Sequence, residues 1–458
     1  SWEEKPEMRR KRSRSTSILH LLGTGPLLSL LVSGYAAQTA HAGEIAYGIG
    51  YLGEYSDNIR RAPSGQMSEW INSALAGVAY RENAPALDAH LLAQAEYRDY
   101  MDDTYNDGMF YFADASLLWR IAPQRLNWVL VDRYGQLTRD ISLPDTPDNR
   151  INTNVLTTGP DILIRLGQVN TLVFGLRYGN ASYSEGSLDS NSYGASARWQ
   201  HAANTEMTYS LNYEAVQLEY EDQILNDNFT RQDIFIRTDM HAARTRFQLD
   251  LGATQVNRDV AGETSGYLAR LNWSQQLTSG SSAGMLLASE YLDAGTVFLS
   301  TATSPTVTPD VTSLTPATNE VSNDFYYTKR AEIYYTRIDG SFGLNARAYY
   351  RDIDYEVAPQ DRLEAGGRLD VTYSLFSLLA ATVYGSHLDI QYQGFTRDDR
   401  ESETGIRLQY RVNRTVSATL DGRKTWRYST DALQEYTDHR VLFSLLYSSS
   451  PLFIPSRR

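Results

Sequence analysis

Residues 406 to 412 read Ile-Arg-Leu-Gln-Tyr-Arg-Val, so apolar side chains alternate with charged or amide-bearing ones. In an extended chain, successive side chains point to opposite faces, which places the apolar residues on one face and Arg407, Gln409 and Arg411 on the other. The segment therefore predicts a β-strand with one face against apolar material and the other against water.

The same period of two recurs along the chain, at 87–97, 207–214, 246–251, 344–351 and 440–447. These segments run about 11 to 14 residues, longer than most strands of soluble proteins but suited to a tilted membrane crossing. No stretch after Val32 is apolar for long enough to predict a transmembrane helix.

Short and long connectors alternate between these segments. Tight connections are predicted near 83–85, 122–123, 167–168, 202–203, 242–243, 277–280, 339–340, 375–377 and 413–414, and long polar ones at 56–66, 99–108, 135–151, 219–228, 293–323, 391–401 and 428–437. Together they predict an all-β fold: a single transmembrane antiparallel up-and-down β-barrel of about 20 strands, within a range of roughly 16 to 22, with short periplasmic turns and long extracellular loops. A β-propeller or a secreted sandwich is the alternative, but no repeat of fixed length supports it.

Composition narrows the function classes. The 458 residues carry 42 Lys and Arg against 55 Asp and Glu, a formal net charge of -13, which argues against nucleic acid as a partner. Because the chain has no cysteine, disulfides and thiolate metal sites are excluded. Its 32 tyrosines suit the headgroup regions of a membrane, where an amphipathic ring is favoured.

The first 42 residues predict an export signal. A basic cluster at 9–14 precedes an apolar core from Ile18 to Val32, and Ala40-His41-Ala42 offers the small residues of a cleavage site. A membrane anchor is the alternative, but glycines and a proline at 23–26 interrupt the apolar run. The predicted domains are an export signal with upstream residues at 1–42, an outer-membrane barrel at 43–448 and a C-terminal tail at 449–458. Either Tyr447 or Phe453 ends the last strand.

Three segments together resemble a family: Tyr-Ser-Asp-Asn-Ile at 55–59, Leu-Gln-Tyr-Arg-Val-Asn-Arg-Thr-Val-Ser-Ala at 408–418, and Tyr-Thr-Asp-His-Arg-Val at 436–441. They are similar to the outer-membrane β-barrel porin family found beside exopolysaccharide systems of Gram-negative bacteria. The resemblance covers residues 43 to 448. It implies a bacterial outer-membrane location and a porin-like role, and says little about the solute.

The polar face of the alternating segments predicts a wet lumen, because arginine facing lipid at the bilayer midplane costs roughly 2 to 4 kcal/mol. The predicted pore-lining residues are Arg246, Asp250, Arg270, Arg347, Arg351, Glu364, Arg368, Arg407, Arg411, Asp421 and Arg423. Opposed acidic and basic rows would order water and polar solutes at a constriction. Since the two signs nearly balance, we expect weak ion selectivity. These charges could instead only brace the wall.

The expected function is passive passage of small hydrophilic solutes or a role in polysaccharide export, without catalysis, cofactor or bound metal. The expected partners are outer-membrane lipid and lipopolysaccharide, the barrel-assembly machinery, and the small polar solutes or polysaccharide, but no nucleic acid. A non-conducting structural barrel remains an alternative. A membrane-embedded hydrolase is another, since His387 with Asp389, and His439 with Asp438, lie near predicted strand ends.

Two predicted loop regions carry further expectations. The Thr- and Pro-rich segment 293–323 would either constrict the pore or stand outside as a mobile surface. The acidic residues Asp398, Asp399, Glu401 and Glu403 would bind divalent cations that link lipopolysaccharide, or would simply be solvated.

Overall fold

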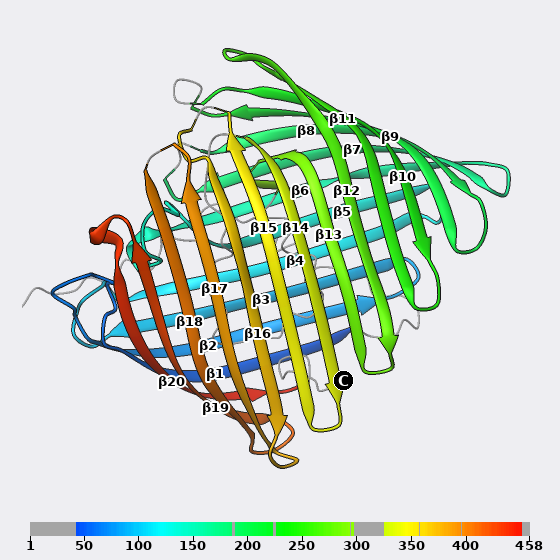
Figure 1. Ribbon diagram of the computed structural model, residues 1–458. Helices are drawn as coiled ribbons and strands as arrows, with labels where there is room; N and C mark the ends of the chain where they lie inside the picture. Colours follow the sequence, from blue (N-terminus) through cyan, green and yellow to red (C-terminus); the bar gives the residue numbers. More distant parts are fainter. Residues whose placement is uncertain are drawn as a thin grey trace, which may run out of the picture. The chain divides into compact units, whose positions relative to one another are not determined.

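The computed structural model describes residues 43–450, apart from 186–187, 223–225, 294, 297–324, 357 and 395. Twenty strands form one sheet in this part of the chain (Figure 1). They are β1 (Glu44–Ser56), β2 (Glu69–Asn83), β3 (Leu87–Tyr100), β4 (Gly108–Ala122), β5 (Leu126–Thr138), β6 (Arg150–Leu166), β7 (Asn170–Tyr183), β8 (Ser190–Ala202), β9 (Met207–Tyr220), β10 (Phe229–His241), β11 (Thr245–Arg258), β12 (Gly262–Thr278), β13 (Ser281–Leu292), β14 (Tyr326–Asp339), β15 (Phe342–Tyr355), β16 (Arg362–Ser374), β17 (Leu379–Tyr392), β18 (Arg397–Arg411), β19 (Val416–Ser429) and β20 (Tyr436–Ser448).

The sheet closes on itself. Each strand pairs antiparallel with the next, and β1 pairs with β20 in a register that sets Gly48 opposite Ser448 and Ser56 opposite Arg440. Closure leaves no free edge of backbone donors and acceptors, which is what permits a sheet to span lipid. The predicted fold class, a closed antiparallel barrel of about 20 strands, is confirmed.

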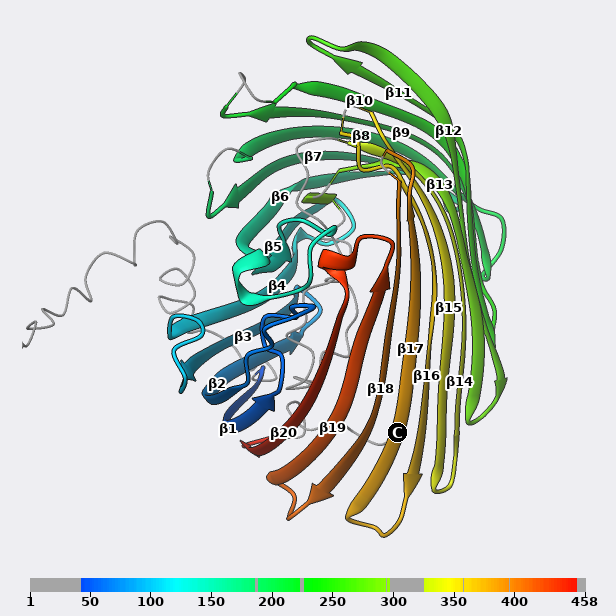
Figure 2. The ribbon, with the colours of Figure 1, turned by 60° about the vertical axis from the view of Figure 1, so that its left-hand side comes forward.

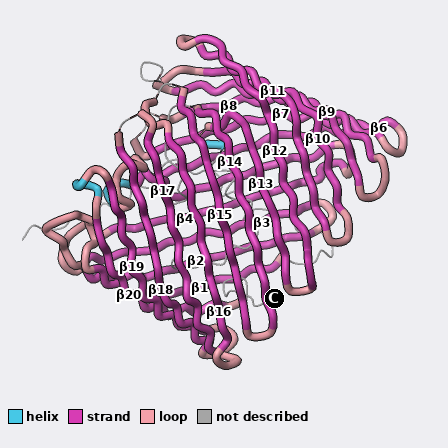
Figure 3. Tube along the Cα trace, in the orientation of Figure 1, coloured by secondary structure: helices cyan, strands magenta, loops and turns pink. Residues whose placement is uncertain are grey.

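Helical structure is confined to short turns among the described residues, as Figure 3 shows by colour. The 3-10 turns η1 (Pro147–Asn149) and η3 (Ala432–Gln434) lie in connections between strands. No helix in the described part of the chain is long and apolar enough to cross a membrane. The last strand ends at Ser448, one residue after Tyr447, while Phe453 and the predicted export signal at 1–42 lie outside the described residues.

The prediction of the connectors was correct at the short-turn end and incomplete at the other. Connections also occur at 184–189, 259–261 and 356–361, where the sequence had suggested none. The predicted loop at 391–401 contains the connection but is too long, because β17 continues to Tyr392 and β18 begins at Arg397. Charged residues made this loop look longer than it is, since Arg397 and Asp399 are strand residues whose side chains face the lumen.

The outer face is aliphatic and aromatic. Ile406 and Val383 are each 57% exposed and stand opposite one another on β18 and β17, although neither meets water in a membrane. Exposed Trp119, Trp128 and Trp199 lie near the short-turn ends of their strands. Aromatic rings at that height match the boundary between hydrocarbon and headgroups.

Some tyrosines lie on the inner face of the barrel and not at the membrane boundary. Tyr384 and Tyr334 lie on the inner face over glycines of the adjoining strands: a Cβ on Gly405 would come within 2.4 Å of the Tyr384 ring, and one on Gly284 within 2.3 Å of the Tyr334 ring. Because glycine has no side chain, it leaves room for a tyrosine ring of the adjacent strand. This packing stiffens the wall without filling the lumen with aliphatic groups.

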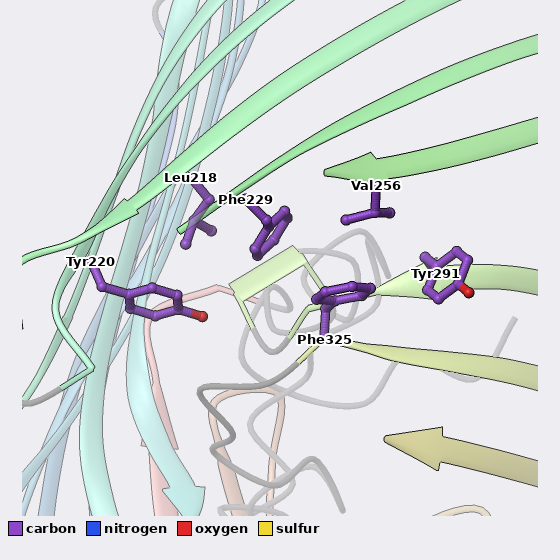
Figure 4. Packing of buried hydrophobic residues seen from close by; sticks show 6 residues of the cluster. All are labelled: Leu218, Tyr220, Phe229, Val256, Tyr291 and Phe325. Atoms are coloured by element: carbon purple, nitrogen blue, oxygen red, sulfur yellow. The ribbon is translucent and has the colours of Figure 1, made fainter. Parts of the chain in front are cut away.

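One aromatic cluster lines the inner wall near the long-loop end. Figure 4 shows Phe325 between Phe229 and Tyr291, with ring centroids 5.1 Å and 5.4 Å apart. Leu218, Tyr220 and Val256 complete this buried cluster. It ties Phe325, which precedes β14, to the wall.

Candidate functional site: a charged and partly occluded lumen

The strand register assigns each predicted pore-lining residue to a face. Asp250 stands opposite Arg237 and Arg270, Arg351 opposite Glu364, and Arg407 opposite Asp421. Extending this register around the barrel places all eleven on the inner face: Arg246, Asp250, Arg270, Arg347, Arg351, Glu364, Arg368, Arg407, Arg411, Asp421 and Arg423. Both lysines of the described residues, Lys329 and Lys424, lie on the outer face.

A ladder of ion pairs runs across β10 to β14. The buried carboxylate of Asp250 accepts two hydrogen bonds from Arg237, at 2.7 and 2.8 Å, and lies 3.5 Å from Arg270. Arg270 also reaches Glu290 at 2.5 Å, and Glu290 accepts from Arg330 at 3.1 Å. Each buried acid therefore lies between two cations, which is the geometry that buried charges need.

A second group surrounds Tyr384. Its hydroxyl donates to both carboxylate oxygens of Asp421, at 2.9 and 3.0 Å, and Asp421 also accepts from Arg407 at 3.0 Å. The guanidinium groups of Arg407 and Arg368 lie 5.4 and 5.0 Å from the centre of the Tyr384 ring. This arrangement presents fixed charge to the lumen with little freedom for the side chains to reorient.

The remaining predicted residues are less tightly held. Arg347 meets Glu332 at 2.7 Å and is 54% exposed, and Arg351 lies 3.5 Å from Glu364, which also pairs with Arg362. Arg423 lies 4.0 Å from Glu54. The inner wall thus combines tightly braced pairs with looser cations near β19.

The connection between β5 and β6, residues 139–149, is called here the inward loop because it reaches strands far from its own. The Tyr392 hydroxyl donates to the carbonyl of Ile141 at 3.4 Å, and Arg397 donates to the carbonyl of Ser142 at 2.5 Å. Neither β17 nor β18 neighbours β5 or β6 in the sheet. In Figure 2 the loop lies at the barrel mouth and extends toward the ends of β18 to β20.

The inward loop keeps its shape through its own hydrogen bonds. The buried side-chain amide of Asn149 donates to the carbonyls of Asp140 and Pro144, at 2.7 and 3.2 Å. The Asn149 side-chain oxygen accepts from the backbone of Asp140 at 3.0 Å. A loop whose backbone carbonyl and amide groups are hydrogen-bonded in this way can lie inside a barrel without leaving them unpaired.

Asp145 of the inward loop lies where several cations converge. Arg150 donates two hydrogen bonds to it, at 2.9 and 3.0 Å. Burial alone would raise the pKa of Asp145, but the charge and hydrogen bonds of Arg150, with the charges of Arg61 and Arg440, outweigh it and lower the pKa to about 2. The carboxylate therefore stays ionised at neutral pH and attracts cations of the β1–β2 connection and β20.

A cavity adjoins Asp145, between the inward loop and strands β1, β2, β3, β18, β19 and β20. Its charged lining is Glu54, Arg61, Glu96, Arg98, Asp145, Arg150, Glu403, Arg423 and Arg440. Most of these form pairs, including Arg98 with Glu96 at 2.7 Å and Arg440 with Glu54 at 2.9 Å. Arg61 is more loosely held: it lies 3.7 Å from Asp438 and over the Tyr436 ring, and its buried Nε has no hydrogen-bond partner.

Sequence reasoning missed most of this mouth region. These residues lie in or beside connectors, where the alternation of apolar and polar residues does not predict to which face a side chain points. They are Arg61, Asp145 and Arg150. The signal that could have pointed to the inward loop is its composition, since residues 139–149 contain two prolines and three aspartates in a compact turn-forming pattern. Of the segment 293–323, predicted as constriction or mobile surface, residues 294 and 297–323 lie outside the described residues.

Two predictions about acidic residues are wrong. Asp399, Glu401 and Glu403 lie on the inner face, where Arg397 meets Asp399 at 2.5 Å and Arg427 meets Glu401 at 2.8 Å, so these three acids do not face lipopolysaccharide. Asp438 is not the partner of His439. It is buried against Ser56 and Arg440, and His439 instead bonds Asp57 at 2.8 Å.

No group of three or more His, Cys, Asp or Glu residues suited to a metal ion occurs in the described part of the chain. The other predicted histidine, His387, lies on the outer face of β17 with Asp389.

The chain is similar to one protein family over part of its length and to several solved structures. Residues 362–447, which span β16 to β20, match the family described as "Putative beta-barrel porin 2". Among solved structures, a ferric enterobactin receptor mutant (PfeA) from Pseudomonas aeruginosa is 9% identical with a TM-score of 0.44, covering 88% of this chain and 80% of that one. OccK2 (OpdF) from the same species is 10% identical with a TM-score of 0.39, covering 89% and 98%. The FrpB iron transporter (F3-3 variant) from Neisseria meningitidis is 12% identical with a TM-score of 0.44, covering 88% and 81%.

No curated protein matches the chain in sequence. The closed wall of 20 strands, together with the family match over its last five, makes the chain a porin-like β-barrel of the outer-membrane type, similar through β16 to β20 to the β-barrel porin 2 family.

Proposed function

We propose that the protein resides in the bacterial outer membrane and conducts small hydrophilic solutes passively. The observation that carries this proposal is the division of the closed wall into two faces: aliphatic residues such as Ile406 outside, and hydrogen-bonded ion pairs such as Arg407 with Asp421 inside. A charged inner face remains hydrated, whereas the outer face is stable only in contact with hydrocarbon.

The inner wall would act on a solute through fixed charge. Rows of arginine and carboxylate held by neighbouring strands produce a field across the lumen, which orients water and polar solutes without any covalent step. Because most lumen arginines lie close to an acid, the field is local and nearly self-cancelling at long range. We therefore expect weak selectivity between simple cations and anions.

The inward loop would set the size limit. It bridges from β5 and β6 to Tyr392 and Arg397 and occupies part of the mouth. This placement favours small solutes over a polysaccharide chain as the permeant.

The outer rim offers a contact for lipopolysaccharide. Lys329 lies 3.1 Å from Asp352 and 3.8 Å from Asp354, all on the outer face near the long-loop end. These exposed charges match the headgroup region in height, and we propose that they meet lipopolysaccharide headgroups there.

Reconstitution in planar bilayers tests the proposed channel. We expect stepwise conductance, reversal potentials in a salt gradient that give a cation-to-anion permeability ratio near one, and a conductance decrease on adding sugars small enough to enter. A heat-modifiable band in gel electrophoresis verifies folding of the sample. If folded protein inserts without conductance, the channel proposal fails and a non-conducting barrel is the correct description.

A further inference from the structure

A hydrogen-bonded chain of three side chains lies on the outer wall, away from the lumen. The ring Nδ1 of His387 is 2.7 Å from the Ser402 hydroxyl oxygen, and its Nε2 is 3.0 Å from a carboxylate oxygen of Asp389. An ionised carboxylate can only accept, so Nε2 carries the proton in the neutral ring, and Nδ1 is left with a lone pair facing the serine hydroxyl. This is the order of nucleophile, base and orienting acid used in acyl transfer.

The strand register holds these groups together. His387 on β17 stands directly opposite Ser402 on β18, and Asp389 lies two residues further along β17 on the same face. Arg400 stands opposite Asp389, and its Nε lies 3.2 Å from the other carboxylate oxygen. Rigid, paired strands therefore fix the positions of the base and its acid, as a catalytic arrangement requires.

The outer wall leaves the site open on one side. On β16 the residue opposite His387 is Gly367, and Gly385 precedes His387 on the same face of β17. Neither has a side chain to cover the imidazole, which is 54% exposed. No charged residue of β16 faces the ring at this height, since Ala365 and Gly367 are opposite Asp389 and His387.

The height of the site matches lipid esters. His387 lies five residues from Tyr392, the end of β17 at the long-loop side, which for a tilted strand is roughly 13 Å below the strand end. Trp426 stands opposite Ser402 on β19, and the ammonium of Lys424 lies 5.5 Å from the centre of its ring. An indole beside a cation is typical of the boundary between acyl chains and headgroups, where ester carbonyls lie.

We propose that Ser402, His387 and Asp389 form a hydrolytic site for fatty-acyl esters of membrane lipids in the outer leaflet. The Ser402 oxygen attacks the ester carbonyl carbon and transfers its proton to Nδ1 of His387, while Asp389 stabilises the resulting imidazolium. Collapse of the tetrahedral intermediate breaks the ester bond, and the leaving alcohol takes the proton from His387. Water then attacks the acylated serine, gives its proton to His387, and releases the fatty acid as the serine recovers its proton.

A cation is placed to stabilise the oxyanion. Lys424 is opposite Thr404 on β18, two residues from Ser402 on the same face. Diagonal neighbours across two strands are about 7 to 8 Å apart, within the reach of a lysine side chain. Lys424 would therefore neutralise the tetrahedral oxygen or the headgroup phosphate, and both roles suit a lipid ester.

Covalent labelling tests the nucleophile directly. The full-length protein, folded in detergent, is treated with a long-chain fluorophosphonate, and the modified peptide is identified by mass spectrometry. We expect labelling at Ser402, its loss in Ser402→Ala, and a decrease of roughly 100-fold or more in labelling rate in His387→Gln. The matched control is His439→Gln, because the ring of His439 also bonds a carboxylate, that of Asp57, but no serine or threonine hydroxyl of the described residues bonds it.

Hydrolysis assays then identify the lipid. One arm supplies mixed micelles of phospholipid and the other supplies purified lipopolysaccharide, with release of free fatty acid as the readout. Release that is lost in Ser402→Ala and Asp389→Asn but kept in His439→Gln supports the proposal and assigns the lipid. Folded wild-type protein that is neither labelled nor able to release fatty acid from either lipid overturns it, as does release that persists in Ser402→Ala. Conductance in planar bilayers tests the channel separately. Since Ser402, His387 and Asp389 do not face the lumen, the hydrolytic proposal can fail while conductance is unchanged.

Discussion

Replacement of Asp145 by asparagine should loosen the inward loop. The pKa of Asp145 falls from its ordinary 3.8 to about 2 because of Arg150, Arg61 and Arg440, despite its burial. That difference corresponds to at most about 2 to 3 kcal/mol, or roughly a 60-fold change in the ratio of docked to released loop. Since the Arg150 contribution lies at the end of the loop itself, the measured effect should be smaller than this limit.

Single-channel recording in planar bilayers measures that ratio. In Asp145→Asn we expect more frequent or longer openings of higher conductance, as the loop leaves the mouth. Asp148→Asn is the matched control, because Asp148 lies in the same loop and carries the same charge but is exposed. If both variants give the same distribution of conductance levels as the wild type, the assignment of Asp145 as an electrostatic anchor is wrong.

The pH dependence follows from the sign of the shift. A carboxylate whose pKa is lowered in the folded state contributes stability above its ordinary pKa and loses it as the pH falls through the folded value. Docking of the loop should therefore be constant from about pH 7 to about pH 5, weaken progressively below about pH 4, and lose the Asp145 contribution by about pH 2. The acid-induced change in the distribution of conductance levels should be absent in Asp145→Asn. A change that persists unaltered in this variant would assign the response to another group.

Three further outcomes are expected. Ile406→Arg should destabilise the barrel in lipid by roughly 2 to 4 kcal/mol, measured by urea unfolding in liposomes, whereas Gln409→Arg on the inner face of the same strand should be tolerated. Gly405→Ala should cost about 1 to 3 kcal/mol, because its Cβ meets the Tyr384 ring at 2.4 Å, while Gly422→Ala, with no atom within 4 Å, should be neutral in the same assay. Arg397→Gln should increase conductance, since it removes the bond to the Ser142 carbonyl, whereas Arg400→Gln on the outer face of β18 should not; equal conductance in the two variants would contradict the bridging role of Arg397.

The inner-face residues were predictable because a strand has a period of two. Once Ile406 faces lipid, Arg407 and Arg411 must face the lumen, whatever the rest of the chain does. The same reasoning placed Asp250 and Glu364 inside from sequence alone. It overestimated the loop at 391–401, because charged residues on the inner face resemble a solvated loop, whereas only residues 393–396 connect β17 to β18.

Alternation decides on which face a side chain lies but not which side chain it meets. The division of each strand into a lipid face and a water face follows from the sequence, because it depends on local periodicity, whereas the strand ends at 184–189, 259–261, 356–361 and 391–401 did not follow from it. The contact of Arg397 with Ser142, and the convergence of Arg61 and Arg440 on Asp145, exist only because β1 and β20 close the wall and bring distant segments across the mouth. The pairing of His387 with Ser402 likewise depends on the register of one hairpin, where a shift by a single residue would separate them.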